Sequence, residues 1–372
     1  MGDSPFLPWQ QGAWNFLSDA LLNDRLPNAF LLYGAEGIGK QQCAEQFAKL
    51  VLCHAPIVSD APIVSGPANA DPTNAKNDQP ESQDVNDAGT YAIPCQQCKS
   101  CLLFAGETHP DYVVAQPEED STIIKIDQIR QLEPVIAQSA QVGARKVIII
   151  TPAEAMNTNA SNAVLKSLEE PSEHTLFILV THRTGQLLPT IRSRCQTVRF
   201  DQPDLATSKS WLLAQCQSAQ LNIDDATLDL LMAHGRGAPL QVYQWLTDDS
   251  ALKLPDIIEG LAKLLKGQTS AVELAQNWKS HPLLDLLKWQ LVWIQQVIRY
   301  QLTTNEAALT VTAKLEMWKY LAQRSSGIRL FEMQDEILQG ITAVNRKTNP
   351  NELLLLETLL LSWQSLMRRQ RA

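Results

Sequence analysis

The sequence predicts a mixed α/β domain built on a parallel sheet and followed by helical domains, and three observations lead to this fold class. Short apolar runs alternate with helical patterns over about the first 200 residues. A glycine-rich loop joins the first of these runs to a helix. Beyond about Gln202 the strand signals stop, and apolar residues recur at helical intervals. Strands that alternate with helices indicate a parallel sheet covered by helices.

The predicted strands are short apolar runs at residues 29–33, 145–150 and 176–180. Runs of this kind are typical of parallel strands that are buried on both faces. Between the second and third runs, apolar residues from Ala163 onward fall at helical spacing, and Pro171 ends that pattern. The alternation therefore continues through the first half of the chain.

The C-terminal third is expected to be all helical. One apolar stripe begins at Pro282 and another follows Asn349-Pro350, and proline is favoured in the first turn of a helix. Large aromatic residues on such stripes usually pack inside a protein. We expect the core of this region to contain Trp289, Trp293 and Trp363.

Length and composition limit the class of protein. A chain of 372 residues exceeds the usual size of a single hydrophobic core, so two or three domains are expected. Apolar residues make up 45%, with no uncharged apolar run long enough to cross a bilayer, and the N-terminus lacks a secretory pattern. These features predict a soluble, cytoplasmic protein. The net charge of −9 argues against a main surface that binds DNA, because phosphate binding needs clustered Lys and Arg.

Residues 55–93 depart from the rest of the sequence. They are rich in Pro, Asn, Asp, Ser and Ala, and they contain a direct repeat, Ala-Pro-Ile-Val-Ser, at 55–59 and 61–65. Between Asp60 and Asp87 six acids stand against one lysine, which gives a local charge of −5. Such a composition cannot form a core, so the sequence predicts a disordered insertion.

The loop Gly34-Ala-Glu-Gly37-Ile-Gly39-Lys40-Gln41 fits a Walker A phosphate loop up to its last position. Its glycines allow backbone N–H groups to converge on phosphate, and its lysine supplies a cation. The eighth position is normally Ser or Thr, whose hydroxyl binds Mg²⁺, but here it is Gln41. A longer amide side chain does not easily replace that ligand, so ATP binding is doubtful.

The carboxylates that usually accompany such a loop are also missing. The strand at 146–150 leads into Thr151-Pro152, where an Asp-Glu pair would hold metal and activate water. Glu154 lies nearby but is displaced along the chain. Phosphoryl transfer depends on positioned metal and charge, so the sequence predicts no intrinsic ATPase. That the loop is only a structural turn remains an alternative.

Cys95, Cys98 and Cys101 place three thiols within one short segment. In a reducing compartment this spacing indicates a metal site, and tetrahedral zinc needs a fourth ligand. His54 and His109 are candidates for that position. An iron–sulfur cluster is less favoured, because the ferredoxin pattern requires another cysteine followed by proline. Unliganded cysteines in a loop are the remaining alternative.

Several segments together resemble the AAA+ subunits of bacterial clamp loaders, which belong to DNA polymerase III. The match covers about the first 200 residues, and the leucine-rich C-terminal stretch resembles the end of a non-catalytic member of the family. The matching motifs are Asn162-Ala-Val-Leu-Lys-Ser-Leu-Glu-Glu-Pro171, Ser193-Arg194-Cys195, the cysteine cluster, and Thr108-His-Pro-Asp111 behind it.

The resemblance implies a domain order and a set of partners. We expect an AAA+ domain at 1–202 with a zinc module at about 94–112, a helical lid at 203–248 and a helical collar at 249–372. The implied partners are the delta and gamma/tau subunits of a hetero-pentamer, with the sliding clamp and primed DNA reached through the complex. The resemblance also implies that nucleotidyl transfer by the DNA-directed DNA polymerase takes place elsewhere in the holoenzyme.

The resemblance also assigns residues. Cys53 is implied as the fourth zinc ligand, in a structural site without an open position, although the insertion separates it from the other three cysteines. Arg194 is implied as an arginine finger that acts in trans on ATP bound to a neighbouring subunit. Leu240 stands where active members place a nucleotide-sensing arginine. The chain is thus expected to be a non-hydrolysing stator.

Two alternatives come from other classes of protein. An active gamma/tau-type ATPase is disfavoured by Gln41, Thr151 and Pro152. A zinc-dependent DNA-binding module would need a basic face near the cysteines, but only Lys99 is close to them in the sequence.

Overall fold

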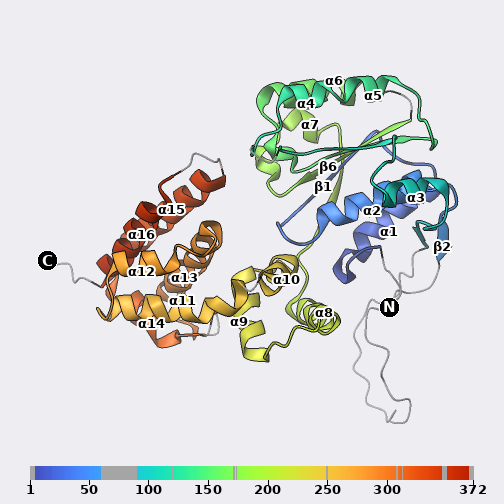
Figure 1. The fold of residues 1–372 in the computed structure, drawn as a ribbon. Helices are drawn as coiled ribbons and strands as arrows, with labels where there is room; N and C mark the ends of the chain where they lie inside the picture. The colour runs from blue at the N-terminus through green and yellow to red at the C-terminus, as the bar shows by residue number, and fades with distance from the viewer. Residues whose placement is uncertain are drawn as a thin grey trace, which may run out of the picture. The chain divides into compact units, whose positions relative to one another are not determined.

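The computed structural model describes residues 5–59, 90–118, 121–170, 172, 174–248, 250–306, 309–311, 313–345 and 350–367. These residues form two compact units. The first lies within Met1–Glu119 and Ile123–Pro203, and the second lies within Asp204–Ala372 together with Asp120–Thr122. Figure 1 shows strands and helices in the first unit, whereas the described part of the second is helical.

A five-stranded parallel sheet forms the centre of the first unit, in the order β4-β5-β6-β1-β7. The three inner strands contain the apolar runs that predicted a parallel sheet, and the structure confirms that prediction. The edge strands are less buried: β7 has no continuous apolar run, and β4 is apolar but only four residues long, with three of them partly exposed. The strands are β1 (Ala29–Gly34), β4 (Tyr112–Ala115), β5 (Lys146–Ile150), β6 (Thr175–Thr181) and β7 (Gln196–Phe200).

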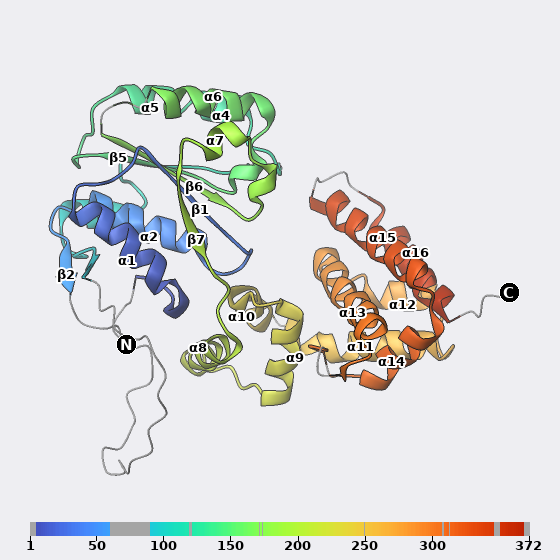
Figure 2. The ribbon, with the colours of Figure 1, turned by 180° about the vertical axis from the view of Figure 1, so that it is seen from behind.

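Helices cover both faces of this sheet (Figure 2). Successive strand residues point to opposite faces, so Leu32 joins the core under α1 and α2 while Leu31 joins the core under α4, α6 and α7. The helices are α1 (Gln11–Leu22), α2 (Lys40–Leu52), α4 (Ile126–Arg130), α5 (Glu133–Ala137), α6 (Thr158–Glu169) and α7 (Pro189–Arg192), with short turns η1 (Pro8–Gln10), η2 (Ala153–Ala155) and η3 (Thr184–Gln186).

The predicted disordered insertion needs correction at both of its ends. Strands β2 (Ile57–Ser59) and β3 (Tyr91–Ile93) pair antiparallel, with Ile57 opposite Ile93. The pairing is anchored because the Trp14 indole donates to the Ala92 carbonyl at 3.0 Å. The ends of the insertion are therefore paired strands, although their composition predicted a polar loop. Residues 60–89, where most of the insertion lies, are outside the described residues.

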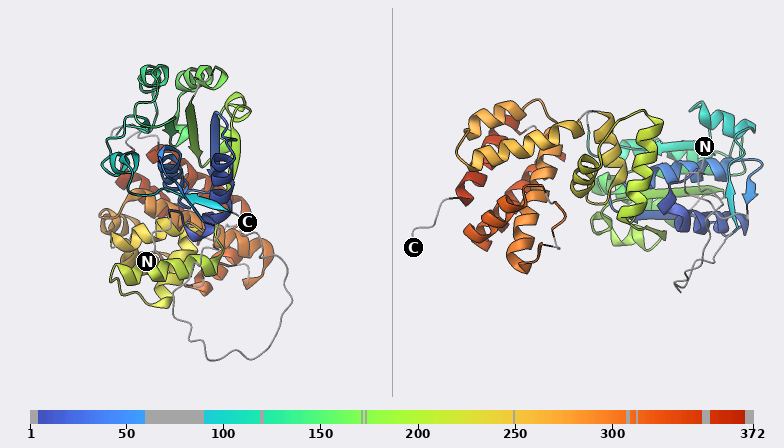
Figure 3. Two further views of the ribbon diagram at one scale, coloured as in Figure 1. Left: turned by 90° about the vertical axis from the view of Figure 1, so that its right-hand side faces the viewer. Right: turned by 90° about the horizontal axis from the view of Figure 1, so that it is seen from below.

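The second unit is built from helices packed around α13, which contacts both α14 and α15. Figure 3 shows the helices of this unit from two further sides. The sequence places two helix starts near Pro282 and Pro350, and α13 and α16 begin just after them. The helices are α8 (Leu205–Ser218), α9 (Asp225–Gly235), α10 (Pro239–Thr247), α11 (Ser250–Leu265), α12 (Ala271–Trp278), α13 (Leu283–Thr303), α14 (Leu315–Arg324), α15 (Gly327–Asn345) and α16 (Glu352–Leu366).

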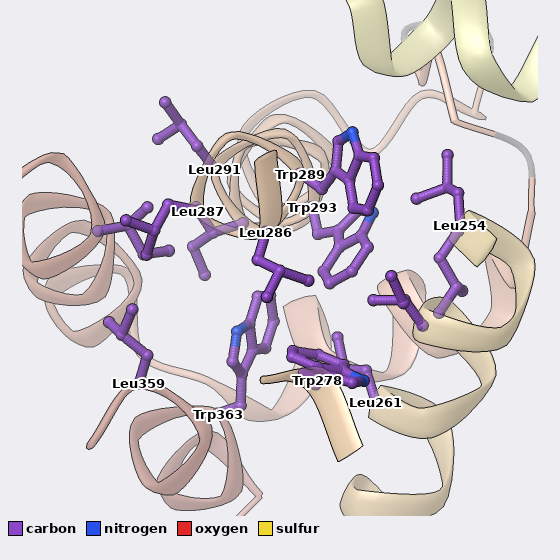
Figure 4. Packing of buried hydrophobic residues seen from close by; sticks show 14 of the residues in the cluster. Leu254, Leu261, Trp278, Leu286, Leu287, Trp289, Leu291, Trp293, Leu359 and Trp363 are labelled. Carbon is purple, nitrogen blue, oxygen red and sulfur yellow. The ribbon is translucent and has the colours of Figure 1, made fainter. Parts of the chain in front are cut away.

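Tryptophans fill the core of the second unit, as the sequence predicts. Trp289, Trp293 and Trp363 are fully buried, and Figure 4 shows them among leucines of several helices. Two of them also form internal hydrogen bonds. The Trp363 indole donates to Gln290 at 3.0 Å, and the Trp293 indole donates to the His234 ring at 2.7 Å.

One continuous core runs from α8 to α16. It crosses the boundary expected between a lid at 203–248 and a collar at 249–372, since Trp245 of α10 packs edge-on against Trp289 of α13 at 5.5 Å. The division into a lid and a collar therefore stays a prediction. Within the described residues, no helix is both long and apolar enough to span a membrane.

Candidate functional site

The glycine-rich loop connects the carboxyl end of β1 to the first residue of α2. Gly37 and Gly39 have φ values of 76° and 83°, in the left-handed region that favours glycine. Gly34 lies so close to β7 that a Cβ there would be 2.3 Å from the Phe200 carbonyl oxygen. The backbone geometry therefore requires glycines here, independently of any ligand.

The N-terminal segment braces this loop from one side. The Trp9 indole and the Gln10 side-chain amide both donate to the Ile38 carbonyl oxygen at 2.9 Å. Gln10 is fully buried and also accepts from the Leu7 N–H at 3.0 Å. These contacts were not predicted, because Trp9 and Gln10 lie nearly thirty residues from Ile38 in the sequence. They support the loop backbone at Ile38.

The loop lysine has acceptors inside its own unit. Lys40 is only 2% exposed, and its Nζ donates to the Ala35 carbonyl and to His182 Nδ1, the latter at 2.8 Å. Burial lowers the pKa of Lys40 to about 8, although Glu154 and Glu36 act in the opposite direction. The ammonium group thus carries a desolvation penalty within its own fold.

His182 and Glu154, which are both half-buried, complete this cluster. His182 follows β6, and its backbone N–H donates to Glu154 Oε1 at 3.0 Å. Burial lowers the pKa of His182, and the neighbouring Lys40 lowers it further, which favours a neutral ring that accepts from the lysine. The other carboxylate oxygen of Glu154 is buried without a hydrogen-bond partner. Glu154 therefore contacts the cluster, although the sequence marked it only as displaced from the usual carboxylate position.

The position that would bind a nucleotide's metal is bridged by two neutral side chains. Gln41 Oε1 accepts from the Thr151 hydroxyl at 3.4 Å, and Gln41 Nε2 donates to Glu45 at 2.9 Å. Thr151 directly follows β5, where a carboxylate pair is normally needed. Mg²⁺ requires oxygen ligands in near-ideal octahedral geometry, usually with carboxylates. These residues do not fit a metal–nucleotide complex.

The cysteines that the sequence singled out come together at the other end of α2. The sulfur atoms of Cys53, Cys95, Cys98 and Cys101 all lie within 4.8 Å of one another. Cys53 and Cys98 Sγ are 3.9 Å apart. A tetrahedral zinc site with bonds of about 2.3 Å has sulfur–sulfur edges of about 3.8 Å, so the four residues fit such a metal.

Backbone geometry orients these sulfurs. Cys53 caps the C-terminus of α2, and Cys98 caps the N-terminus of α3 (Lys99–Ala105). The N–H groups of Cys95, Cys98 and Cys101 donate to the preceding cluster sulfurs at 3.3 to 3.4 Å. Donors of this kind stabilise thiolates and fix the direction of metal ligands.

The histidines that the sequence kept as alternative ligands have other partners. His109 is buried, with Nε2 2.8 Å from the Ser100 hydroxyl and Nδ1 accepting from the Asp111 N–H at 3.1 Å. His54 Nε2 lies 3.1 Å from the Val142 carbonyl. Neither histidine belongs to the group of converging ligand atoms. The four cysteines alone make up the candidate metal centre within the described residues.

Arg194 lies on the surface of the first unit, just after α7. Its Nη2 pairs with Glu169 Oε1 at 2.7 Å, and its Nη1 donates to the Thr190 carbonyl at 3.0 Å. The following residue, Cys195, is buried and anchors the segment in the core under α6 and α7. The Arg194 side chain therefore lies at the surface, in contact with Glu169 and Thr190.

Comparison with known proteins identifies the family. Residues 9–64 and 58–204 match the family described as "DNA polymerase III, delta subunit", and residues 253–365 match its C-terminal family. A DNA polymerase III subunit delta' from Pseudomonas aeruginosa is 37% identical over 359 residues, covering 96% of this chain and 97% of that protein. The chain belongs to the delta prime family.

Other relatives place the delta prime chain among DNA polymerase III subunits more widely. A delta' subunit from Yersinia pestis is 32% identical over 285 residues, covering 73% of this chain and 79% of that protein. A tau subunit from Bacillus subtilis is 26% identical over 222 residues, covering 59% of this chain and 33% of that protein. The similarity to these two delta prime subunits thus extends over more of the chain than the similarity to this tau subunit.

Proposed function

We propose that this delta prime chain is a clamp-loader subunit that does not hydrolyse ATP itself and that completes the ATPase site of a neighbouring subunit with Arg194. The main support is that two neutral side chains, Gln41 and Thr151, stand 3.4 Å apart where the metal of a bound nucleotide would usually meet a hydroxyl and carboxylates. The engagement of Lys40 by Ala35 and His182 adds to it. Without positioned metal and lysine, little remains to stabilise the charge of phosphoryl transfer.

The role proposed for Arg194 follows from the family and from the surface position of the side chain. An arginine supplied in trans stabilises charge on the transferred phosphoryl group and is worth roughly 10³ to 10⁵ in rate in well-studied GTPases. The partners are then the delta and gamma/tau subunits, in a hetero-pentamer that places the sliding clamp on primed DNA in the cytoplasm. The chain serves there as a stator.

The cysteine cluster is proposed to hold structural zinc. Ligation by Cys53, Cys95, Cys98 and Cys101 leaves no open position for water, so the ion would supply folding energy rather than chemistry. It would fix α3 and the strand pair β2–β3 against the end of α2.

ATP hydrolysis tests the proposal. Turnover is measured for the isolated chain and for the complex reconstituted with delta and gamma subunits of the same bacterium, with wild type compared to Arg194→Ala. We expect negligible turnover by the isolated chain. In the complex, single turnover at the adjoining site should fall about 10³-fold in the variant, while gel filtration shows unchanged assembly.

Arg192→Ala is the matched control, because Arg192 is an exposed arginine at the end of α7. Robust turnover by the isolated chain would favour the gamma/tau-type ATPase instead. Equal turnover in the wild-type and Arg194→Ala complexes would refute the role of the arginine.

A further inference from the structure

The Arg194 guanidinium is folded back onto its own unit. Its two terminal nitrogens contact different elements, since Nη2 pairs with Glu169 at the end of α6 and Nη1 donates to Thr190 of α7. The Arg194 side chain is 35% exposed and that of Glu169 is 49% exposed. The side chain therefore lies along the surface in this conformation.

The backbone around Arg194 is held firmly. Its N–H donates to the Ile191 carbonyl at 3.1 Å, and the Ser193 hydroxyl donates to the Thr190 carbonyl at 3.1 Å. Ile191 and Cys195 on either side belong to the core. A change in the position of the guanidinium therefore has to come from side-chain rotation.

Glu169 stands at an unusual position for a carboxylate. It is the last residue of α6, where the partial negative charge of the helix terminus disfavours an acidic side chain. Arg194 offsets that repulsion through the 2.7 Å contact. Because both side chains are exposed, such a pair is worth only a factor of about two to five in an equilibrium. A phosphate group carries more charge and is the stronger acceptor.

We propose that Glu169 is a positioning residue for Arg194. Its carboxylate holds the guanidinium against α6 and α7 until the phosphates of a nucleotide on the neighbouring subunit replace it as the acceptor. This inference rests on the proposed function, because it requires that Arg194 acts on a neighbour. In this scheme the Arg194 guanidinium leaves the Glu169 carboxylate and binds phosphate when the adjoining site becomes active.

The resting pair is tested first in the isolated chain. NMR of arginine side chains reports the rotation of the Arg194 guanidinium, with the signal assigned from Arg194→Lys. We expect slow rotation in the wild type and faster rotation in Glu169→Gln. Glu170→Gln removes the same charge from the adjacent exposed residue and should leave the signal unchanged. Equal rotation in wild type and Glu169→Gln would overturn the proposal.

The consequence is then tested in the reconstituted complex. Glu169→Gln should raise the turnover number at the adjoining site about twofold to fivefold with little change in KM, because the guanidinium no longer has to leave a carboxylate. Glu169→Asp should restore the wild-type rate, and Glu169→Gln should have no effect in an Arg194→Ala background. Glu170→Gln should behave as the wild type.

The outcomes separate this inference from the function on which it rests. If Arg194→Ala leaves turnover unchanged, the proposed function fails and the inference falls with it. If Arg194→Ala slows turnover but Glu169→Gln matches the wild type, only the inference fails. Slower turnover in the Glu169→Gln complex would show that Arg194 needs Glu169 while it contacts the neighbour's phosphates. That result would also overturn the proposal.

Discussion

Helix α2 carries a candidate site at each of its ends, and the two sites differ in what their polar atoms contact. At the N-terminus, Lys40 and Gln41 are bonded to residues of the same unit. At the C-terminus, Cys53 faces three further sulfurs that converge on one point. In the first site Lys40 and Gln41 have partners within the unit, whereas the second site presents a complete ligand set. The cysteine motif therefore indicates a ligand site more strongly than the glycine-rich loop does, because only the cysteine sulfurs converge on one point.

The largest effect is expected at the cysteine end. The purified chain should carry one zinc ion, and Cys98→Ser should lower the zinc content well below half, because three thiolates cannot complete the tetrahedral site. Structural zinc is worth about 10 kcal/mol or more in small domains, so α3 should lose most of its protection from hydrogen exchange. Metal analysis and exchange measurements check this.

His54→Ala is the control for that experiment, because His54 neighbours Cys53 but lies outside the converging group. It should keep its zinc. A wild-type chain without metal, or a Cys98→Ser chain that keeps a full equivalent, would contradict a four-cysteine site.

The second largest effect is expected at the N-terminus of α2, where Lys40 is buried. Burial lowers the pKa of Lys40 to about 8, from an ordinary value of 10.5. Between these two pH values the Lys40 amine binds its proton more tightly in the unfolded chain than in the folded one. The charged Lys40 therefore lowers the free energy of unfolding by its full amount below pH 8, and this loss decreases as the pH rises above 8. Relative to Lys40→Met, the wild type should gain about 2 kcal/mol of unfolding free energy between pH 8 and 10.

Denaturant titrations at several pH values measure this difference. Lys166→Met, a change at an exposed lysine of α6, is the control and should show no comparable trend. A difference between wild type and Lys40→Met that stays flat with pH would mean that the ammonium group is solvated. The glycine-rich loop would then be accessible to phosphate, and the two ends of α2 would not differ in the way described above.

The smallest effect concerns the brace on the phosphate loop. Trp9→Phe removes one of the two donors to the Ile38 carbonyl while keeping an aromatic ring. Because Gln10 still donates, we expect a loss of about 1 kcal/mol or less in urea denaturation. A loss several times larger would show that the indole supports the loop chiefly by packing.

The central strands and the cysteine triplet were predictable because both depend on local sequence. Continuous apolar runs mark strands buried on both faces, and Cys95, Cys98 and Cys101 lie within one short segment. Cys53 followed only from the resemblance to a family, because it is separated from the triplet by the insertion. Edge strand β7, with the sequence Gln-Thr-Val-Arg-Phe, has no such apolar run, and the run in β4 is only four residues long.

The internal partners of the phosphate loop were not predictable. His182 lies 142 residues from Lys40, and Thr151 lies 110 residues from Gln41. These contacts exist because β5 and β6 end at the same edge of the parallel sheet as β1. The sequence places Thr151 where a carboxylate is missing, but only the topology shows that Thr151 lies beside Gln41 and that His182 contacts Lys40.

Equilibrium binding of Mg·ATP to the isolated chain tests the central claim most directly. Calorimetry with the wild type, with EDTA and Lys40→Met samples for comparison, would measure it. Because Gln41 and Thr151 bridge the metal position and Lys40 has internal acceptors, we predict no saturable binding at millimolar nucleotide. Magnesium-dependent, saturable binding that is lost in Lys40→Met would contradict the account.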